Sequence, residues 1–185
     1  MNHWDKKHYF DTLLQARDLG YEIMRVKDYI PINEYDKSSP EKLIVLRHDV
    51  DYSLDYAHML ATYEQRFDIK STYYIYLHSE TYNALEPRSL EIIKKIEMLG
   101  HEVGLHYDSR YYLAGEQELF DMKTYTQHHP SENKPIRLPF LEDPNDFKLK
   151  YMSDSGRYWR EGCFCKWIGK EDKLLILKYP LCLIN

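Results

Sequence analysis

Apolar residues recur along the first part of the chain in two alternating patterns. Stretches with an apolar residue every three or four positions, the spacing of one helix face, alternate with short apolar or aromatic runs of strand length. The helical pattern covers residues 6–19, 54–67 and 87–99. The strand-like runs lie at residues 21–26, 43–51, 71–77 and 101–107. This alternation predicts a parallel sheet joined by right-handed crossovers, and 185 residues suit a single α/β domain.

Residues that commonly begin or stop a helix stand at the ends of these stretches. Ser53 suits the N-cap of the second helix, and Pro87 suits the first position of the third. Gly20 and Gly100 follow the first and third helices, where a glycine supplies the backbone conformation that ends a helix. We expect the helix boundaries at these residues.

The C-terminal part of the chain has a weaker pattern. We expect a helix from about Glu116 to Gln127, then a long loop over residues 128–146, which hold four prolines. The last strands are expected at Lys150–Ser153 and Leu174–Tyr179. No internal repeat or low-complexity linker interrupts the chain.

An acidic pair follows the apolar run at residues 43–46. Side chains alternate along a strand, so Asp49 and Asp51 point to one side together with Arg47, while His48 points to the other. Two carboxylates this close repel each other unless a cation lies between them. That cation is either a divalent metal or the guanidinium of Arg47, and the residues alone leave both interpretations open.

Two histidines lie on the strand predicted at residues 101–107. The same alternation places His106 with Glu102 and Gly104 on one side and His101 on the other, so the two histidines are not expected to bind one ligand. His106 at the strand end is the candidate ligand. His101, directly after Gly100, is expected to form hydrogen bonds where helix and strand meet. Ligands of open parallel sheets gather at the carboxyl ends of the strands, where Asp49, Asp51 and His106 all lie.

Composition narrows the classes of function. A net charge of −5 without a long basic run argues against a nucleic-acid partner. The 18 tyrosines indicate either a surface that faces a sugar or a partner, or half-buried positions where tyrosine replaces phenylalanine. Three cysteines, an odd number, indicate a reducing compartment; Cys163 and Cys165, on an expected strand, are either ordinary thiols or a metal-binding pair.

Nothing in the sequence has the length of an apolar signal or transmembrane segment. We therefore expect a soluble cytoplasmic protein.

Four segments together resemble the polysaccharide deacetylase (NodB-like) superfamily, in particular its intracellular branch associated with surface-polysaccharide genes. These segments are residues 47–51, 71–74, 100–107 and 153–160, and the resemblance covers roughly residues 8 to 180 in the right order. It implies a distorted, incomplete (β/α) barrel. It also implies a divalent metal, most often zinc, held by one Asp and two His.

The resemblance assigns roles to the acidic pair and the histidine. Asp49 matches the general base that activates a water, Asp51 matches the metal ligand, and His106 matches the first ligand histidine. Such a set is chemically coherent, because a metal with an open position acidifies water and a nearby carboxylate takes the proton.

The chain also departs from the superfamily. Arg110 stands where the second ligand histidine is expected, and a guanidinium does not bind a metal. The third ligand must come from elsewhere, with His128 as the first candidate and His129 as the second. In the last strand Tyr179 stands before a proline in place of a histidine that serves as general acid. Tyr179 either substitutes as the proton donor or the acid is missing.

Further residues are assigned by the same resemblance. Arg137 begins an Arg-x-Pro-aromatic segment that matches the motif orienting the base. Asp154, Arg157 and Arg160 form either a network that grips an anionic part of the substrate or a surface salt-bridge network. Arg47 and Tyr107 complete the expected substrate-binding residues.

The sequence therefore predicts a metal-dependent hydrolase that removes an acyl, usually acetyl, group from an amino-sugar precursor of a surface polysaccharide. The precursor is expected to be linked to a nucleotide or a lipid. Two alternatives stay open: a catalytically impaired descendant that binds a sugar or a protein partner, and a hydrolase of a non-sugar C–N bond.

Overall fold

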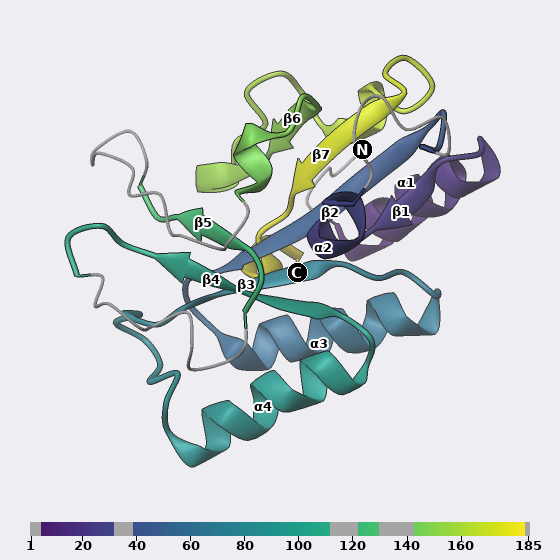
Figure 1. Ribbon diagram of the computed structural model, residues 1–185. Helices are drawn as coiled ribbons and strands as arrows, with labels where there is room; N and C mark the ends of the chain where they lie inside the picture. Colours follow the sequence, from purple (N-terminus) through teal and green to yellow (C-terminus); the bar gives the residue numbers. More distant parts are fainter. Residues whose placement is uncertain (1–4, 32–38, 112–121, 130–142, 184–185) are drawn as a thin grey trace.

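A curled parallel sheet that forms a half-barrel is the centre of the molecule (Figure 1). The computed structural model describes residues 5–31, 39–111, 122–129 and 143–183. Within them, seven strands lie in the order β5-β4-β3-β2-β7-β6, with β1 paired to β2. Their bounds are β1 Glu22–Met24, β2 Leu43–Val50, β3 Thr72–Tyr76, β4 Glu102–Tyr107, β5 Tyr125–Gln127, β6 Lys150–Ser153 and β7 Lys173–Leu177. The arrangement is an α/β fold compatible with the predicted incomplete (β/α) barrel.

The central strand β2 has three parallel neighbours, which share its two edges. Strand β7 pairs along residues 43–47 of β2, so β1, which pairs with residues 43–45, must occupy the opposite edge. Strand β3 continues that edge from Arg47 to Val50. The carboxyl-terminal half of β2 therefore lies directly between β3 and β7, and it ends next to both.

In the described part of the chain four α-helices accompany the sheet: α1 Lys6–Asp18, α2 Val26–Tyr29, α3 Leu54–Arg66 and α4 Pro87–Met98. The side chain of Ser53 accepts a hydrogen bond from the backbone N–H of Tyr56 and caps α3 as predicted. Pro87 begins α4, and Gly100 follows it with a φ of 92°. None of the helices in the described ranges is long and apolar enough to cross a membrane.

Short 3-10 helices lie between and after the last strands. They are η2 Pro144–Asp146, η3 Ser155–Arg157, η4 Phe164–Lys166 and η5 Pro180–Leu183. Two predictions for this half of the chain were wrong. Residues 125–127 form strand β5 and not the end of a helix, and Cys163 and Cys165 border or lie within η4 and not on a strand. Residues 112–121 of the predicted helix lie outside the described residues.

The sheet separates two groups of buried side chains. The larger group joins α1, α3 and α4 to one face, with Ile44, Leu46 and Leu105 among its fully buried members. The smaller group lies on the other, concave face, where Val45 packs with Val26 of α2. The alternation predicted for β2 and β4 is confirmed, because Arg47, Asp49 and His106 share the concave side.

Candidate metal centre

One carboxylate and two imidazoles converge at the carboxyl end of the sheet. Asp51 follows β2, His106 belongs to β4, and His128 follows β5, and one ligand atom from each lies within 4.8 Å of the others. Nε2 of His106 is 3.4 Å from Oδ1 of Asp51, and Nε2 of His128 is 4.0 Å from Oδ2 of the same carboxylate. These residues form a group that can hold a metal ion.

The other ring nitrogen of each histidine faces an oxygen from an outer residue. Nδ1 of His106 lies 2.7 Å from the hydroxyl and 3.2 Å from the carbonyl oxygen of Thr126 on β5. Nδ1 of His128 lies 3.7 Å from Oδ2 of Asp108. The acceptor at Nδ1 of His106 keeps the proton there and leaves Nε2 free to bind a cation, which is the usual arrangement of metal-binding histidines. Nδ1 of His128 is buried and has no hydrogen-bond partner among the described residues.

Aromatic stacking and a backbone hydrogen bond fix the position of His128. Its ring stacks on Tyr76 of β3 with the centroids 4.4 Å apart. Its backbone N–H donates to the carbonyl oxygen of Tyr107, 2.7 Å away. The chain after β5 is thereby held against the end of β4, and this brings the second imidazole to the first.

The polar atoms that face the centre of this group fit a cation. Among the described residues, Nε2 of His106 and Oδ1 of Asp51 are buried and have no hydrogen-bond partner. Zinc–oxygen and zinc–nitrogen bonds of about 2.1 Å place tetrahedral ligands roughly 3.4 Å apart. The measured 3.4 Å between these two atoms matches that spacing. Buried polar atoms without partners are costly, and a bound cation would satisfy both.

The second carboxylate of the pair lies beside the group and is held by an arginine. Oδ2 of Asp49 is 3.3 Å from Nη2 of Arg47 and 4.0 Å from Nε2 of His106. Oδ1 of Asp49 is buried and has no hydrogen-bond partner among the described residues. The guanidinium thus neutralises Asp49 on one side only. The two interpretations of the acidic pair therefore coexist, because Arg47 pairs with Asp49 while Asp51 faces the imidazoles.

Charges within the group change its proton affinities. Burial opposes ionisation of Asp51, yet His106 and then His128 attract its negative charge and lower its pKa. Burial opposes protonation of His106, but Asp49 and Asp51 outweigh it and raise its pKa. Burial and the charge of His106 lower the pKa of His128. The group therefore has an excess of negative charge that favours a cation or a proton at its centre.

Tyr179 lies on the other side of the acidic pair. It lines a small pocket together with Asp49, Asp51 and Ser53. Burial, followed by the charges of Asp49 and Asp51, raises its pKa far above the ordinary value. The phenol therefore keeps its proton and acts as a hydrogen-bond donor more readily than as an acid.

Asp154 positions Tyr179 and belongs to the interior. Its Oδ1 accepts the backbone N–H of Tyr179 at 2.9 Å, and its Oδ2 accepts Nζ of Lys178 at 2.5 Å. Both side chains of this ion pair are buried. Asp154 is thus committed to Lys178 and does not form the predicted network with Arg157 and Arg160, whose side chains are exposed.

One other predicted site residue that the structure describes is not part of the group. Tyr107 is buried in the core on the helix-covered face, where its ring packs near Tyr125 and its hydroxyl donates to Gln127. As the residue after His106 in β4, it points away from the centre, so the assignment to substrate binding is corrected. Arg137 lies outside the described residues.

A groove of about 560 Å³ opens from the centre to the surface. Asp51 and His128 form its inner end, and its other lining residues are mostly aromatic or polar. These residues are Tyr52, Tyr76, His78, Ser79, Glu80, Thr81, Arg110, Tyr111 and His129. Its volume and lining suit a small polar ligand with apolar ring faces.

Asp108 and Tyr76 are the residues that the sequence interpretation missed. Arg110 donates to both oxygens of Asp108, 2.6 Å at the shortest, and these bonds lower the pKa of Asp108. The hydroxyl of Tyr76 lies 3.3 Å from the same carboxylate. The signal was available for Asp108, because a residue two positions after His106 returns to the same side of the strand. Tyr76 is the neighbour of His106 across the sheet, which only the strand pairing reveals.

Comparison with known proteins adds no family to this description. A scan against models of protein families, a search of curated proteins and a search of solved structures each found no match.

Proposed function

We propose that the protein is a metal-dependent hydrolase that removes an acyl group, most simply acetyl, from an amino-sugar precursor of a surface polysaccharide. The observation that carries the proposal is the convergence of Asp51, His106 and His128 beside the half-neutralised carboxylate of Asp49. The resemblance of four sequence segments to NodB-like deacetylases supplies the reaction class.

Asp51, His106 and His128 would hold the cation, and zinc suits one carboxylate and two imidazoles. A cation bound there supplies a Lewis acid, which acidifies a water and polarises an amide carbonyl. The hydrogen bond to Thr126 holds the imidazole of His106 in the orientation that exposes Nε2, and stacking on Tyr76 holds the ring of His128.

Asp49 would take the proton from the attacking water. Its Oδ1 is the unpaired oxygen, while Arg47 contacts Oδ2. The ion pair holds the carboxylate in place, so the base is positioned without movement of the side chain.

Tyr179 would donate a hydrogen bond to the oxygen or nitrogen of the scissile group. The backbone bond from Tyr179 to buried Asp154 fixes the start of this segment. Because the raised pKa of the phenol disfavours release of its proton, we assign it stabilisation of developing negative charge.

The groove beside the centre would hold the amino sugar. Tyr52 and Tyr111 are exposed aromatic residues on its lining, and flat ring surfaces suit the apolar faces of a pyranose. Nothing in the groove fixes the identity of the sugar or of its carrier.

The test combines metal binding with product detection. Purified protein is expected to bind about one equivalent of zinc at this group and to release acetate from N-acetylated amino-sugar nucleotides. The variants Asp51→Asn and His106→Asn should lose both the zinc and the acetate, whereas Asp49→Asn should retain the zinc and lose the acetate. His58→Asn, which changes a half-buried histidine of α3 outside the group, is the matched histidine control.

A binding protein without activity is the rival proposal, and one contact favours it. Arg110, which replaces the expected second histidine, is bound to Asp108 beside His128. Zinc binding by the parent protein without release of acetate, together with saturable sugar binding, would support the rival. If the protein instead hydrolyses a cyclic amide and releases no acetate from amino-sugar nucleotides, the alternative of a hydrolase of a non-sugar C–N bond is supported.

A further inference from the structure

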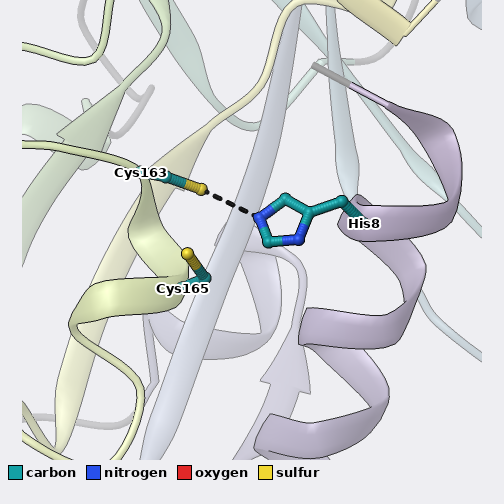
Figure 2. A group of neighbouring side chains, drawn as sticks. All are labelled: His8, Cys163 and Cys165. Atoms are coloured by element: carbon teal, nitrogen blue, oxygen red, sulfur yellow. Dashed lines mark hydrogen bonds between the residues drawn. The ribbon is translucent and has the colours of Figure 1, made fainter. Parts of the chain in front are cut away.

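Two thiols and an imidazole meet in a second group, which shares no residue with the first. Figure 2 shows His8 of α1 beside Cys163 and Cys165, with the sulfur atom of Cys163 facing the ring. Nε2 of His8 lies 3.3 Å from Sγ of Cys163, and one ligand atom of each residue lies within 4.8 Å of the others. The two cysteines come from the segment around η4, 155 positions further along the chain than His8.

The backbone around η4 explains how two cysteines of a Cys-x-Cys segment reach the same point. Along a strand, residues i and i+2 also share a side, but their side chains stand parallel to each other. Here Cys163 is the N-cap of the 3-10 turn and Cys165 lies within it, so the chain curves around the imidazole. Phe164 between them points into the core and anchors the turn.

The spacing of the three donors is close to that of a coordination sphere. Zinc–sulfur bonds of about 2.3 Å and zinc–nitrogen bonds of about 2.0 Å place tetrahedral donors roughly 3.6 to 3.8 Å apart. The 3.3 Å between His8 and Cys163 is within a few tenths of an ångström of this value. The remaining separations, at most 4.8 Å, need only a rotation of the half-buried Cys165.

The surroundings favour a cation over two adjacent ionised thiols. Cys163 is buried and Cys165 is half-buried, so water compensates little of the charge that two thiolates would place there. The nearest buried positive charge, Lys178, is already paired with Asp154. A metal that binds both sulfur atoms would supply the missing positive charge and displace their protons.

We propose that His8, Cys163 and Cys165 bind a thiophilic d¹⁰ cation, Zn²⁺ or Cu(I), which clamps α1 to the segment around η4. Two sulfur donors and one imidazole select these ions against Mg²⁺ and Ca²⁺, which prefer oxygen. Binding releases one proton from each thiol to the solvent and changes no oxidation state. The fourth position of a zinc ion is left to solvent, whereas Cu(I) is satisfied by three donors.

A clamp at this point would connect parts of the chain that are distant in sequence. Cys163 and Tyr9, the residue after His8, both belong to the main core, beside Phe164 and Trp159. The ion would therefore join the first helix to the segment that precedes β7. The proposal does not rest on the hydrolase function, because none of its residues contacts the first group.

Cobalt titration of the reduced protein tests the proposal, because cobalt–thiolate bonds give a charge-transfer absorption that oxygen and nitrogen ligands do not. A Cys182→Ser background leaves Cys163 and Cys165 as the only thiols. With Asp51→Asn/His106→Asn added to this background to remove the first group, the protein should develop the thiolate band with about one equivalent of cobalt and release about two protons, and zinc should bleach the band. Titration with Cu(I) against a coloured chelator forms the second arm and distinguishes the two ions.

Variants separate this group from the first one. Cys165→Ser and His8→Asn, which change half-buried side chains, should reduce the band at least tenfold while circular dichroism shows an intact fold. The double variant Asp51→Asn/His106→Asn should keep the band even if it loses the first ion, and His58→Asn should behave as the parent. Absence of a thiolate band in the folded, reduced parent, or a band that persists in Cys165→Ser, overturns the proposal and leaves ordinary thiols.

Discussion

Single positions on β2 and β4 decide which side chains meet at the candidate metal centre. Arg47, Asp49 and His106 lie on the concave face because of their parity along the strands, and His48 lies on the helix-covered face for the same reason. The alternation rule therefore predicted three of the important positions from sequence alone. The same rule places Tyr107 on the helix-covered face, where the structure has it; its assignment to substrate binding came from the family resemblance and not from its side of the strand.

Gly104 shows how closely the concave face is packed. A Cβ atom at this position would lie 2.6 Å from Cδ1 of Tyr74 and 2.9 Å from Oγ1 of Thr124. Both neighbours are buried, so neither can move away freely. We expect Gly104→Ala to lower the free energy of unfolding by about 1 to 3 kcal/mol.

Urea denaturation of Gly104→Ala would measure this decrease in the free energy of unfolding. A second substitution identifies its cause. In a Tyr74→Leu background the ring that crowds Gly104 is absent, so adding Gly104→Ala should cost much less than it does in the parent. Equal costs in the two backgrounds would mean that the ring is not responsible.

At the level of whole elements, the sequence predicted helices and long strands well and short elements poorly. Helices α1, α3 and α4 combine an apolar face with recognisable ends, and their predicted limits were confirmed. Strand β5 has three residues, too few for a period of two to emerge above chance, and it was predicted as helix. The turn at η4 was predicted as a strand for the same reason, and this concealed the convergence of Cys163 and Cys165 on His8.

The start of α3 provides a test at this scale, since it follows directly on Asp51. Oγ of Ser53 accepts the backbone N–H of Tyr56 at 3.3 Å. Ser53→Ala removes this cap and should destabilise the protein by about 1 kcal/mol in thermal or urea unfolding. Ser53→Thr retains a hydroxyl acceptor and should stay within a few tenths of a kcal/mol of the parent. If both variants were equally stable, the cap would make no contribution.

For the whole molecule, the order of the strands was beyond the reach of the sequence. Successive strand–helix–strand units predict parallel neighbours, and β2, β3 and β4 follow that rule. The last strand, β7, instead returns to the free edge of β2, with β6 outside it. This return brings Tyr179 to Asp49 and Asp51, and it depends on pairing across more than a hundred residues, which no local pattern encodes.

A buried carboxylate connects the layers of the fold. Glu64 of α3 is fully buried and lies at hydrogen-bond distance from four groups on three other segments, α1, β2 and β3 with the residue before it. These groups are the hydroxyls of Tyr9, Ser71 and Tyr73 and Nε2 of His48. Burial alone would raise the pKa of Glu64, but the charge and hydrogen bond of His48, then His101 and Ser71, lower it from 4.5 to about 2.

This shift makes the stability of the protein dependent on pH in the acid range. In the unfolded chain Glu64 takes up a proton below about 4.5, whereas in the folded protein it stays ionised down to about 2. The unfolded state binds more protons between these values, so the contribution of Glu64 is complete above 4.5 and is lost as the pH falls toward 2. The difference between these two pKa values corresponds to a contribution of roughly 3 kcal/mol to the free energy of unfolding at neutral pH.

Glu64→Gln should therefore unfold at a lower urea concentration at neutral pH, with a loss of about 3 kcal/mol or more, because donors that faced a charge would face an amide. The difference in free energy of unfolding between parent and variant should decrease as the pH is lowered from about 6 to about 3. Glu91→Gln on the exposed face of α4 removes one carboxylate of the same kind and should leave the pH dependence of unfolding unchanged. If the difference in free energy of unfolding between the parent and Glu64→Gln stays constant across this pH range, the carboxylate of Glu64 is not ionised in the folded protein.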